Sequence, residues 1–111
     1  MTENRPWGFY KVLHEGPDYK IKLLHIEPRK RISYQKHKHR SEHWFVASGC
    51  PLVTLDGAIE VLYPGSSINV PIGTPHRLEA GDLPVEIIEV QTGTYFGEDD
   101  IIRIEDDYGR N

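Results

Sequence analysis

Residues 52–63, Leu52-Val-Thr-Leu-Asp-Gly-Ala-Ile-Glu-Val-Leu-Tyr63, contain two apolar, β-branched runs joined by Asp56-Gly57. A two-residue Asp-Gly connection is the strongest short-range signal for a β-hairpin, because a type I′ turn needs positive φ at both central residues. The segment therefore predicts two antiparallel strands, over residues 51–55 and 58–63.

The same pattern of short strands and tight turns continues along the chain. Ten Gly and eight Pro separate segments rich in Val, Ile, Leu, Tyr and Trp. No segment between them has a 3.6-residue apolar period with room for three helical turns, which favours an all-β sandwich or barrel. We expect strands over residues 8–15, 19–26, 31–37, 43–48, 51–55, 58–63, 67–70, 76–80 and 85–92. The acidic tail, residues 97–111, could form a short helical turn, an edge strand or a clasp over the barrel.

Length and composition indicate a single domain over residues 1–111. Hydrophobic residues make up 38% and charged residues 27%, as in a globular protein. The formal charge of -4 argues against nucleic acid as a partner, because phosphate binding needs a basic face. No apolar run is long enough to cross a membrane, and residues 1–7 do not resemble a signal peptide. A lone Cys50 excludes an internal disulfide and a Cys-rich zinc site. We expect a cytoplasmic protein.

The histidines gather in Gln35-Lys-His-Lys-His-Arg-Ser-Glu-His43. On a strand, Gln35, His37 and His39 would share one face, because side chains two residues apart point the same way. Imidazoles followed by the Glu42 carboxylate suit a divalent metal. A solvated basic loop would use the same residue types, so this segment alone leaves both interpretations open. Three other histidines are expected to have structural or surface positions: His14, His25 and His43.

A second segment, Gly65-Ser-Ser-Ile-Asn-Val-Pro-Ile-Gly-Thr-Pro-His76, ends in another histidine. Its prolines and Gly73 predict a tight turn that returns the chain into a strand starting at His76. Taken alone, this is a plain turn followed by a histidine. Taken with the first segment, it favours one shared metal site.

The two segments together resemble the cupins, which are double-stranded β-helix proteins of the jelly-roll type. The second cupin motif, G-x5-P-x-G-x2-H-x3-N, is matched by Gly65, Pro71, Gly73 and His76, with Ala80 at the Asn position. In the first motif, G-x5-H-x-H-x3-4-E-x6-G, Glu42 and Gly49 have the expected spacing. Gln35 occupies the place of the first histidine, and Arg29-Lys30 stand where a turn glycine is expected.

Within the cupins, the chain is similar to the type II mannose-6-phosphate isomerase domain. The similarity is carried in order by Arg5-Pro-Trp-Gly8, residues 35–44, Gly73-Thr-Pro-His-Arg77, Ile87-Ile-Glu-Val-Gln91 and residues 97–110. That domain is usually the C-terminal part of a bifunctional enzyme of GDP-mannose and polysaccharide biosynthesis, behind a mannose-1-phosphate guanylyltransferase module. This chain is expected to be a stand-alone form of the domain, so the nucleotide-sugar step is expected to be absent. The family commonly has three consecutive histidines where this chain has His37-Lys38-His39.

The resemblance implies a bound divalent metal, zinc first, with Co, Mn or Ni also compatible with N and O ligands. The implied ligands are Gln35, His37, Glu42 and His76. His39 is the chief rival to Gln35.

The resemblance also implies an isomerase that interconverts mannose 6-phosphate and fructose 6-phosphate. Its catalytic candidates are Arg40 and Glu89. Glu89 could be a buried general base or a residue on the exposed face of its strand, and the exposed position is slightly favoured. The candidates for binding the substrate phosphate are Arg40, Lys22 and Arg31. Arg77 is expected to point away from the site.

The expected partners are a small phosphorylated sugar and a second copy of the chain, in a homodimer formed around residues 7–10. Trp7, Trp44 and Tyr34 are expected to be core or rim aromatics. The alternative functions are a non-catalytic cupin that binds a metal or a sugar, and a different cupin enzyme, either an oxygenase or another sugar isomerase.

Overall fold

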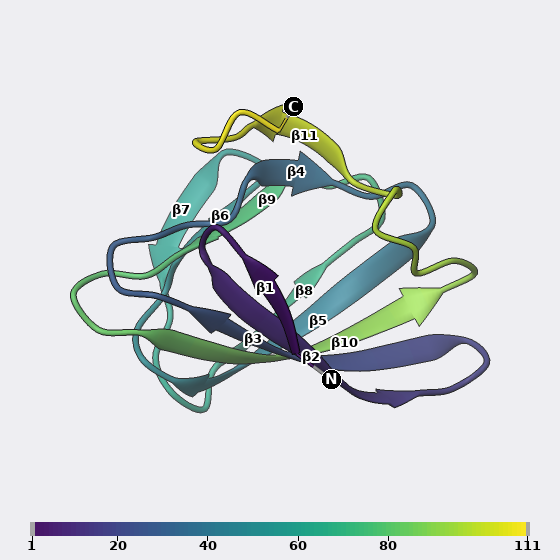
Figure 1. Cartoon of the computed structure of the whole chain (residues 1–111), viewed down its shortest axis with the longest axis horizontal. Coiled ribbons are helices and arrows are strands. Elements are labelled where there is room, and N and C mark those ends of the chain that lie inside the picture. The colour runs from purple at the N-terminus through teal and green to yellow at the C-terminus, as the bar shows by residue number, and fades with distance from the viewer. Residues whose placement is uncertain (1, 111) are drawn as a thin grey trace.

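The computed structural model describes residues 2–110, and its regular elements are strands (Figure 1). In chain order they are β1 Thr2–Arg5, β2 Gly8–Glu15, β3 Tyr19–Ile26, β4 Tyr34–Lys36, β5 Arg40–Ser48, β6 Leu52–Leu55, β7 Ala58–Val61, β8 Ser67–Val70, β9 His76–Glu79, β10 Val85–Gly93 and β11 Ile102–Glu105.

The strands form two sheets that enclose a common interior. One sheet has the order β1-β2-β3-β10-β5-β8, and the other has the order β11-β4-β9-β6-β7. Strand β10 lies between β3 and β5, antiparallel to both, at the centre of the larger sheet. This arrangement confirms the all-β, two-sheet architecture predicted from the sequence.

The predicted strands agree closely with the observed ones. Strands β2, β3 and β8 have the predicted bounds, and Asp56 and Gly57 have φ angles of 49° and 83°, as a type I′ hairpin requires. Strand β1 was not predicted, because Thr2–Arg5 is polar and shows no apolar alternation. Strand β4 ends at Lys36 and β5 begins at Arg40, so residues 37–39 form a turn instead of continuing a strand.

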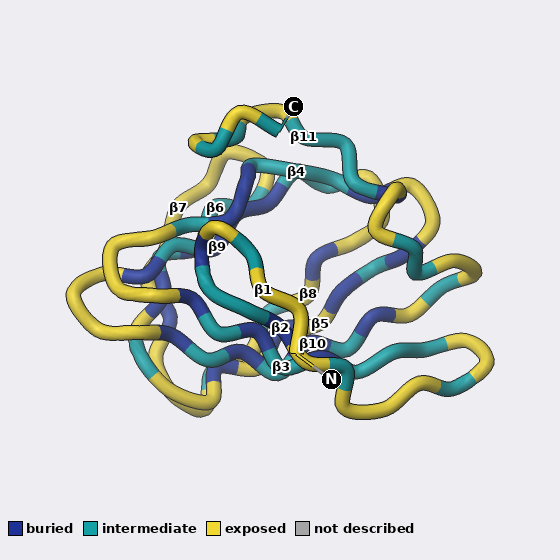
Figure 2. The backbone as a smooth tube through the Cα atoms, viewed as in Figure 1, coloured by how far each residue is buried: buried dark blue, intermediate teal, exposed yellow. Residues whose placement is uncertain are grey.

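The interior has an apolar part and a polar part. The fully buried apolar side chains include Ile26, Trp44, Val46, Val53, Leu78, Val85 and Ile87. Along β10, the inward positions change from Val85 and Ile87 to Glu89 and Gln91, all four of which are buried (Figure 2). The polar half of β10 pairs with the part of β5 that carries Glu42. Ionisable and amide side chains therefore lie inside the barrel at this end.

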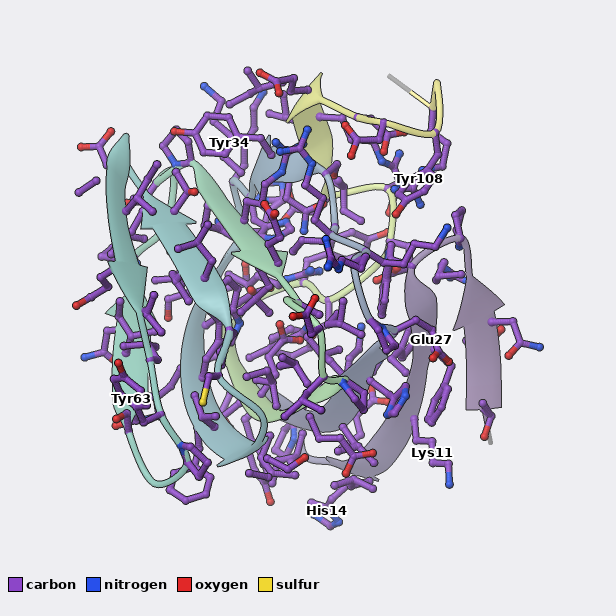
Figure 3. The ribbon with its side chains drawn as sticks, turned by 90° about the vertical axis from the view of Figure 1, so that its left-hand side faces the viewer. Lys11, His14, Glu27, Tyr34, Tyr63 and Tyr108 are labelled. Carbon is purple, nitrogen blue, oxygen red and sulfur yellow. The ribbon has the colours of Figure 1, made fainter. Side chains whose placement is uncertain are left out.

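The C-terminal segment adds a strand to the edge of the smaller sheet. Strand β11 pairs with β4 at the edge of the smaller sheet, so of the three alternatives for the tail the edge strand is confirmed (Figure 1). Tyr108 donates a hydrogen bond to the Arg31 carbonyl at 3.0 Å, and Figure 3 shows Tyr34 and Tyr108 beside this segment. The segment thus lies against the start of the histidine motif.

Trp7 and Tyr10, which were expected near a dimer contact, are buried within the single chain. The homodimer therefore stays a prediction. Within residues 2–110, no helix has the length and apolar character needed to cross a membrane.

Candidate metal centre

Three side chains from separate elements converge inside the barrel. His37 follows β4, Glu42 lies on β5 and His76 opens β9, and all three are buried. Their potential ligand atoms lie within 4.8 Å of one another. The two sequence segments that carry these residues thus meet at one place, as the motif pair predicted.

Backbone carbonyls orient both imidazoles. His37 Nδ1 lies 2.7 Å from the Asp100 carbonyl oxygen, and His76 Nδ1 lies 2.9 Å from that of Thr74. A carbonyl oxygen can only accept, so each Nδ1 carries a hydrogen, and in the neutral form of each ring Nε2 then presents a lone pair. The Nε2 atoms lie 3.2 Å (His37) and 3.5 Å (His76) from the Glu42 carboxylate.

The donor set fits a divalent cation. The buried His76 Nε2 makes no hydrogen bond to any residue in 2–110, so an acceptor is left unpaired inside the protein. Burial lowers the pKa of His76, although Glu42 opposes this effect, and the ring is thereby kept in the neutral form that binds metals. Burial alone would raise the pKa of Glu42, but positive charge beside it, including the Arg40 guanidinium that donates to it, holds that pKa below its usual range. Two neutral imidazoles and one carboxylate are typical N and O ligands of zinc.

Gln35 and His39 lie in different environments. Gln35 is opposite His76 in the β4–β9 pair and lines a cavity together with Arg40 and Glu42. Its Oε1 accepts a 2.7 Å hydrogen bond from Ser33 Oγ. His39 is exposed, and its ring contacts the edge of Tyr95. The expectation that His37 and His39 share a strand face is therefore wrong, because the chain turns after Lys36.

Arg40 is buried beside the cluster. Its Nε donates to Glu42 Oε2 at 3.0 Å, and its Nη2 lies 3.4 Å from His37 Nε2. Its Nη1 has no hydrogen-bond partner among the described residues. The guanidinium thus balances the Glu42 charge and keeps one donor free.

Glu89 is buried, so the expectation that favoured an exposed position is wrong. Its Oε2 accepts from Trp44 Nε1 at 3.0 Å, and its Oε1 accepts from Gln91 Nε2 at 2.7 Å. Trp44 Nε1 also lies 3.2 Å from Glu42 Oε1, so one indole links the two carboxylates. Burial, reinforced by the nearby Glu42 carboxylate, raises the pKa of Glu89 to about 7.

A cavity next to this cluster is lined by charged side chains. Its cationic residues are Arg5, Lys22, Arg40, Arg103 and Arg110, and its acidic residues are Glu42, Glu89 and Glu98. Lys22 is buried and donates to Glu98 at 3.2 Å. Burial lowers the pKa of Arg103, the nearby Arg110 lowers it further, and Arg103 Nε has no partner among the described residues.

Arg5, Arg103 and Arg110 were not among the sequence candidates. They come from the two ends of the chain, and only the tertiary fold brings them to this cavity. A buried, unpaired guanidinium donor surrounded by other cations suits an anionic ligand.

Two other basic residues, the candidate Arg31 and the non-candidate Arg77, lie outside the cavity. Arg31 is half-buried and forms a two-bond ion pair with Asp107, at 2.6 and 2.8 Å. Arg77 points away from the site, as expected, and donates to the Ile32 carbonyl and to Glu105.

The other histidines and aromatics occupy structural or surface positions. His25 stacks on Phe9 and bonds Glu86, while His43 bonds Asn69 on the outer face. His14 is exposed and points away from the barrel (Figure 3). Trp7 and Trp44 belong to the core, and Tyr34 is half-buried.

Known proteins share both the fold and the sequence pattern. The structure superposes on oxalate decarboxylase from Bacillus subtilis with a TM-score of 0.82 at 18% identity, covering 94% of this chain and 30% of that one. It also superposes on the Cnp3 cupin domain of Schizosaccharomyces pombe with a TM-score of 0.73 at 14% identity, covering 77% and 64%. The fold is therefore that of the cupins, as predicted.

Sequence relatives are much closer. The chain is 48% identical over 107 residues to the alginate biosynthesis protein AlgA of Pseudomonas aeruginosa, which covers 96% of this chain and 22% of AlgA. It is 43% identical over 108 residues to a mannose-1-phosphate guanylyltransferase of Salmonella montevideo, covering 96% and 23%. The chain thus spans less than a quarter of the length of these relatives. Residues 1–106 match the family described as mannose-6-phosphate isomerase C-terminal, and the protein belongs to that family.

Proposed function

We propose that the protein is a metal-dependent isomerase that interconverts mannose 6-phosphate and fructose 6-phosphate. The observation that carries the proposal is the buried cluster of His37, Glu42 and His76 beside a cavity lined by cations, in a member of this family. The cluster suits a metal that polarises a sugar, and the cations suit a phosphate.

The proposed metal ligands are His37, Glu42 and His76, with Gln35 as a fourth through its amide oxygen. Zinc is the first choice, because the set contains imidazole nitrogen and carboxylate oxygen. When bound, such an ion would supply Lewis-acid stabilisation of the negative charge that develops on the sugar oxygens.

Glu89 is the proposed carrier of the proton that moves between C2 and C1 of the open-chain sugar. A pKa of about 7 allows its carboxylate to accept a proton and return it near neutral pH. The hydrogen bonds from Trp44 and Gln91 fix the carboxylate in one orientation. Such positioned acid–base groups contribute roughly 10²–10⁴-fold to rate.

Arg103, with Arg5 and Arg110, is the proposed phosphate-binding group. Arg103 offers a buried Nε donor that no residue in 2–110 accepts from, whereas Lys22 is already bonded to Glu98. Arg40 bonds Glu42 and lies at the metal cluster, so its proposed role is at the reacting end of the sugar.

The test is a coupled assay of purified, metal-loaded protein with mannose 6-phosphate, following fructose 6-phosphate. We expect turnover by the natural sequence, strong loss in Arg103→Ala through a raised KM, and near-normal turnover in Arg29→Ala, whose guanidinium is exposed and pairs with Asp82. Absence of turnover by the metal-loaded natural protein would overturn the proposal. Oxygen uptake in its place would favour another class of cupin enzyme.

A further inference from the structure

We propose that Asp100, in the connection between β10 and β11, is a positioning residue that holds His37 in the geometry needed to bind the metal. This inference rests on the metal site proposed above. Asp100 is not one of the proposed metal ligands, and its role is to orient one of them.

Asp100 makes three hydrogen bonds to the turn that carries His37. Its Oδ1 accepts from the Lys38 backbone N–H at 3.0 Å, and its Oδ2 accepts from that of His39 at 2.9 Å. Its own carbonyl oxygen accepts from His37 Nδ1 at 2.7 Å. Asp100 is 6% exposed, so water does not readily replace these bonds.

The remaining backbone contacts of the turn come from main-chain groups. The His37 carbonyl accepts from the Gly73 N–H at 2.8 Å, and the His39 carbonyl accepts from the Thr94 N–H at 3.2 Å. The Lys38 and His39 N–H groups therefore depend on the Asp100 carboxylate, whereas the His37 and His39 carbonyls are bonded by other segments. Removing the carboxylate leaves these two backbone N–H groups without their acceptors. The turn is then held less firmly next to the hydrogen bond between the His37 ring and the Asp100 carbonyl.

The hydrogen bond between the His37 ring and the Asp100 carbonyl decides which ring nitrogen faces the metal site. With Nδ1–H bonded to the Asp100 carbonyl, the lone pair of Nε2 faces Glu42. If Asp100 shifts, the ring loses this restraint and the other tautomer, with hydrogen on Nε2, becomes accessible. Partners that orient a metal-bound imidazole typically change metal affinity by about 10- to 100-fold.

Asp100 also anchors the C-terminal segment, so the test must separate positioning from anchoring. Asp107 provides the matched control, because its ion pair with Arg31 ties the same segment to the barrel without touching the site. A purely structural role predicts similar effects of the two substitutions. A positioning role predicts that only changes at Asp100 alter the metal centre.

The experiment uses Co²⁺ alone, with affinity from chelator competition and geometry from the visible absorption spectrum. We expect Asp100→Ala to weaken Co²⁺ binding about 10- to 100-fold and to change the spectrum. Asp107→Ala should stay within about twofold of the natural protein with an unchanged spectrum. Circular dichroism confirms that each variant is folded.

Asp100→Asn keeps the carbonyl and one acceptor oxygen, so it decides the matter if Asp100→Ala does not fold. We expect it to weaken Co²⁺ binding at least several-fold. Equal affinity and identical spectra for the natural protein and the folded Asp100 variant would overturn the positioning role while leaving the metal site intact. No Co²⁺ binding by the natural protein would instead overturn the metal site itself.

Discussion

Replacing Glu89 with glutamine tests the buried carboxylate directly. Glu89 is 4% exposed, and burial next to Glu42 raises its pKa from 4.5 to about 7. At ~1.4 kcal/mol for each pH unit, this difference corresponds to about 3 kcal/mol in the metal-free protein.

The sign of the effect follows from proton binding. Between pH 4.5 and about 7, native Glu89 keeps a proton that the unfolded chain releases. The free energy of unfolding therefore falls by about 3 kcal/mol as the pH rises through this window, and Glu89 adds no further change above it. Glu89→Gln abolishes this fall, but costs about 1 kcal/mol because the amide NH2 cannot accept a hydrogen bond, whereas the hydroxyl oxygen of the protonated carboxyl can. We expect the variant to be less stable than the natural protein by ~1 kcal/mol at pH 4.5, and more stable by ~2 kcal/mol at pH 8.

The assay is urea unfolding of metal-free protein at several pH values between 4.5 and 8, followed by tryptophan fluorescence. Glu60→Gln, at an exposed position on β7, serves as the control and should give a pH profile parallel to that of the natural protein. The same Glu89 variant, loaded with metal, should lose isomerase turnover. Parallel stability profiles for Glu89→Gln and the natural protein would refute the raised pKa, and unchanged turnover would refute the role in proton transfer.

Other substitutions test the ligands, the guanidinium and the packing. His37→Ala and His76→Ala should abolish metal retention and leave a folded barrel, as measured by metal analysis and circular dichroism; full occupancy in both would refute the ligand assignment. Arg40→Ala should lower turnover more than metal affinity, because Arg40 bonds Glu42 without supplying a ligand atom; equal losses would indicate a structural role. Gly8→Ala should destabilise the fold by about 1–3 kcal/mol in urea unfolding, because at φ 151° a Cβ would collide with a backbone carbonyl of β3; an unchanged midpoint would contradict this close approach.

The sequence was most informative where pattern and spacing are local. The Asp56-Gly57 hairpin and the alternation in residues 19–26 depend on neighbouring residues alone, and both matched the structure. The pairing of His37 with His76 was also predictable, because two spaced motifs pointed to one site.

Glu89 shows where such patterns fail. Both faces of β10 carry apolar residues, with Ile87 inward and Ile88 and Val90 on the outer face, so alternation could not assign an orientation. Once the structure shows that Val85 is fully buried, counting in steps of two places Glu89 inside as well. The exposed position of His39 depends on a turn held by Asp100, which is distant in sequence, and no local signal marks it.

The inward face of β10 is apolar in its first half and polar in its second half. Its first half fills a hydrophobic interior with Val85 and Ile87, while its second half buries Glu89 and Gln91, groups that are costly to remove from water. Replacing Glu89 and Gln91 with aliphatic residues of similar volume should raise the melting temperature of the barrel and abolish the proposed isomerase activity. If the proposed isomerase function holds, thermal stability and activity make opposite demands on the residues at the polar end of this strand.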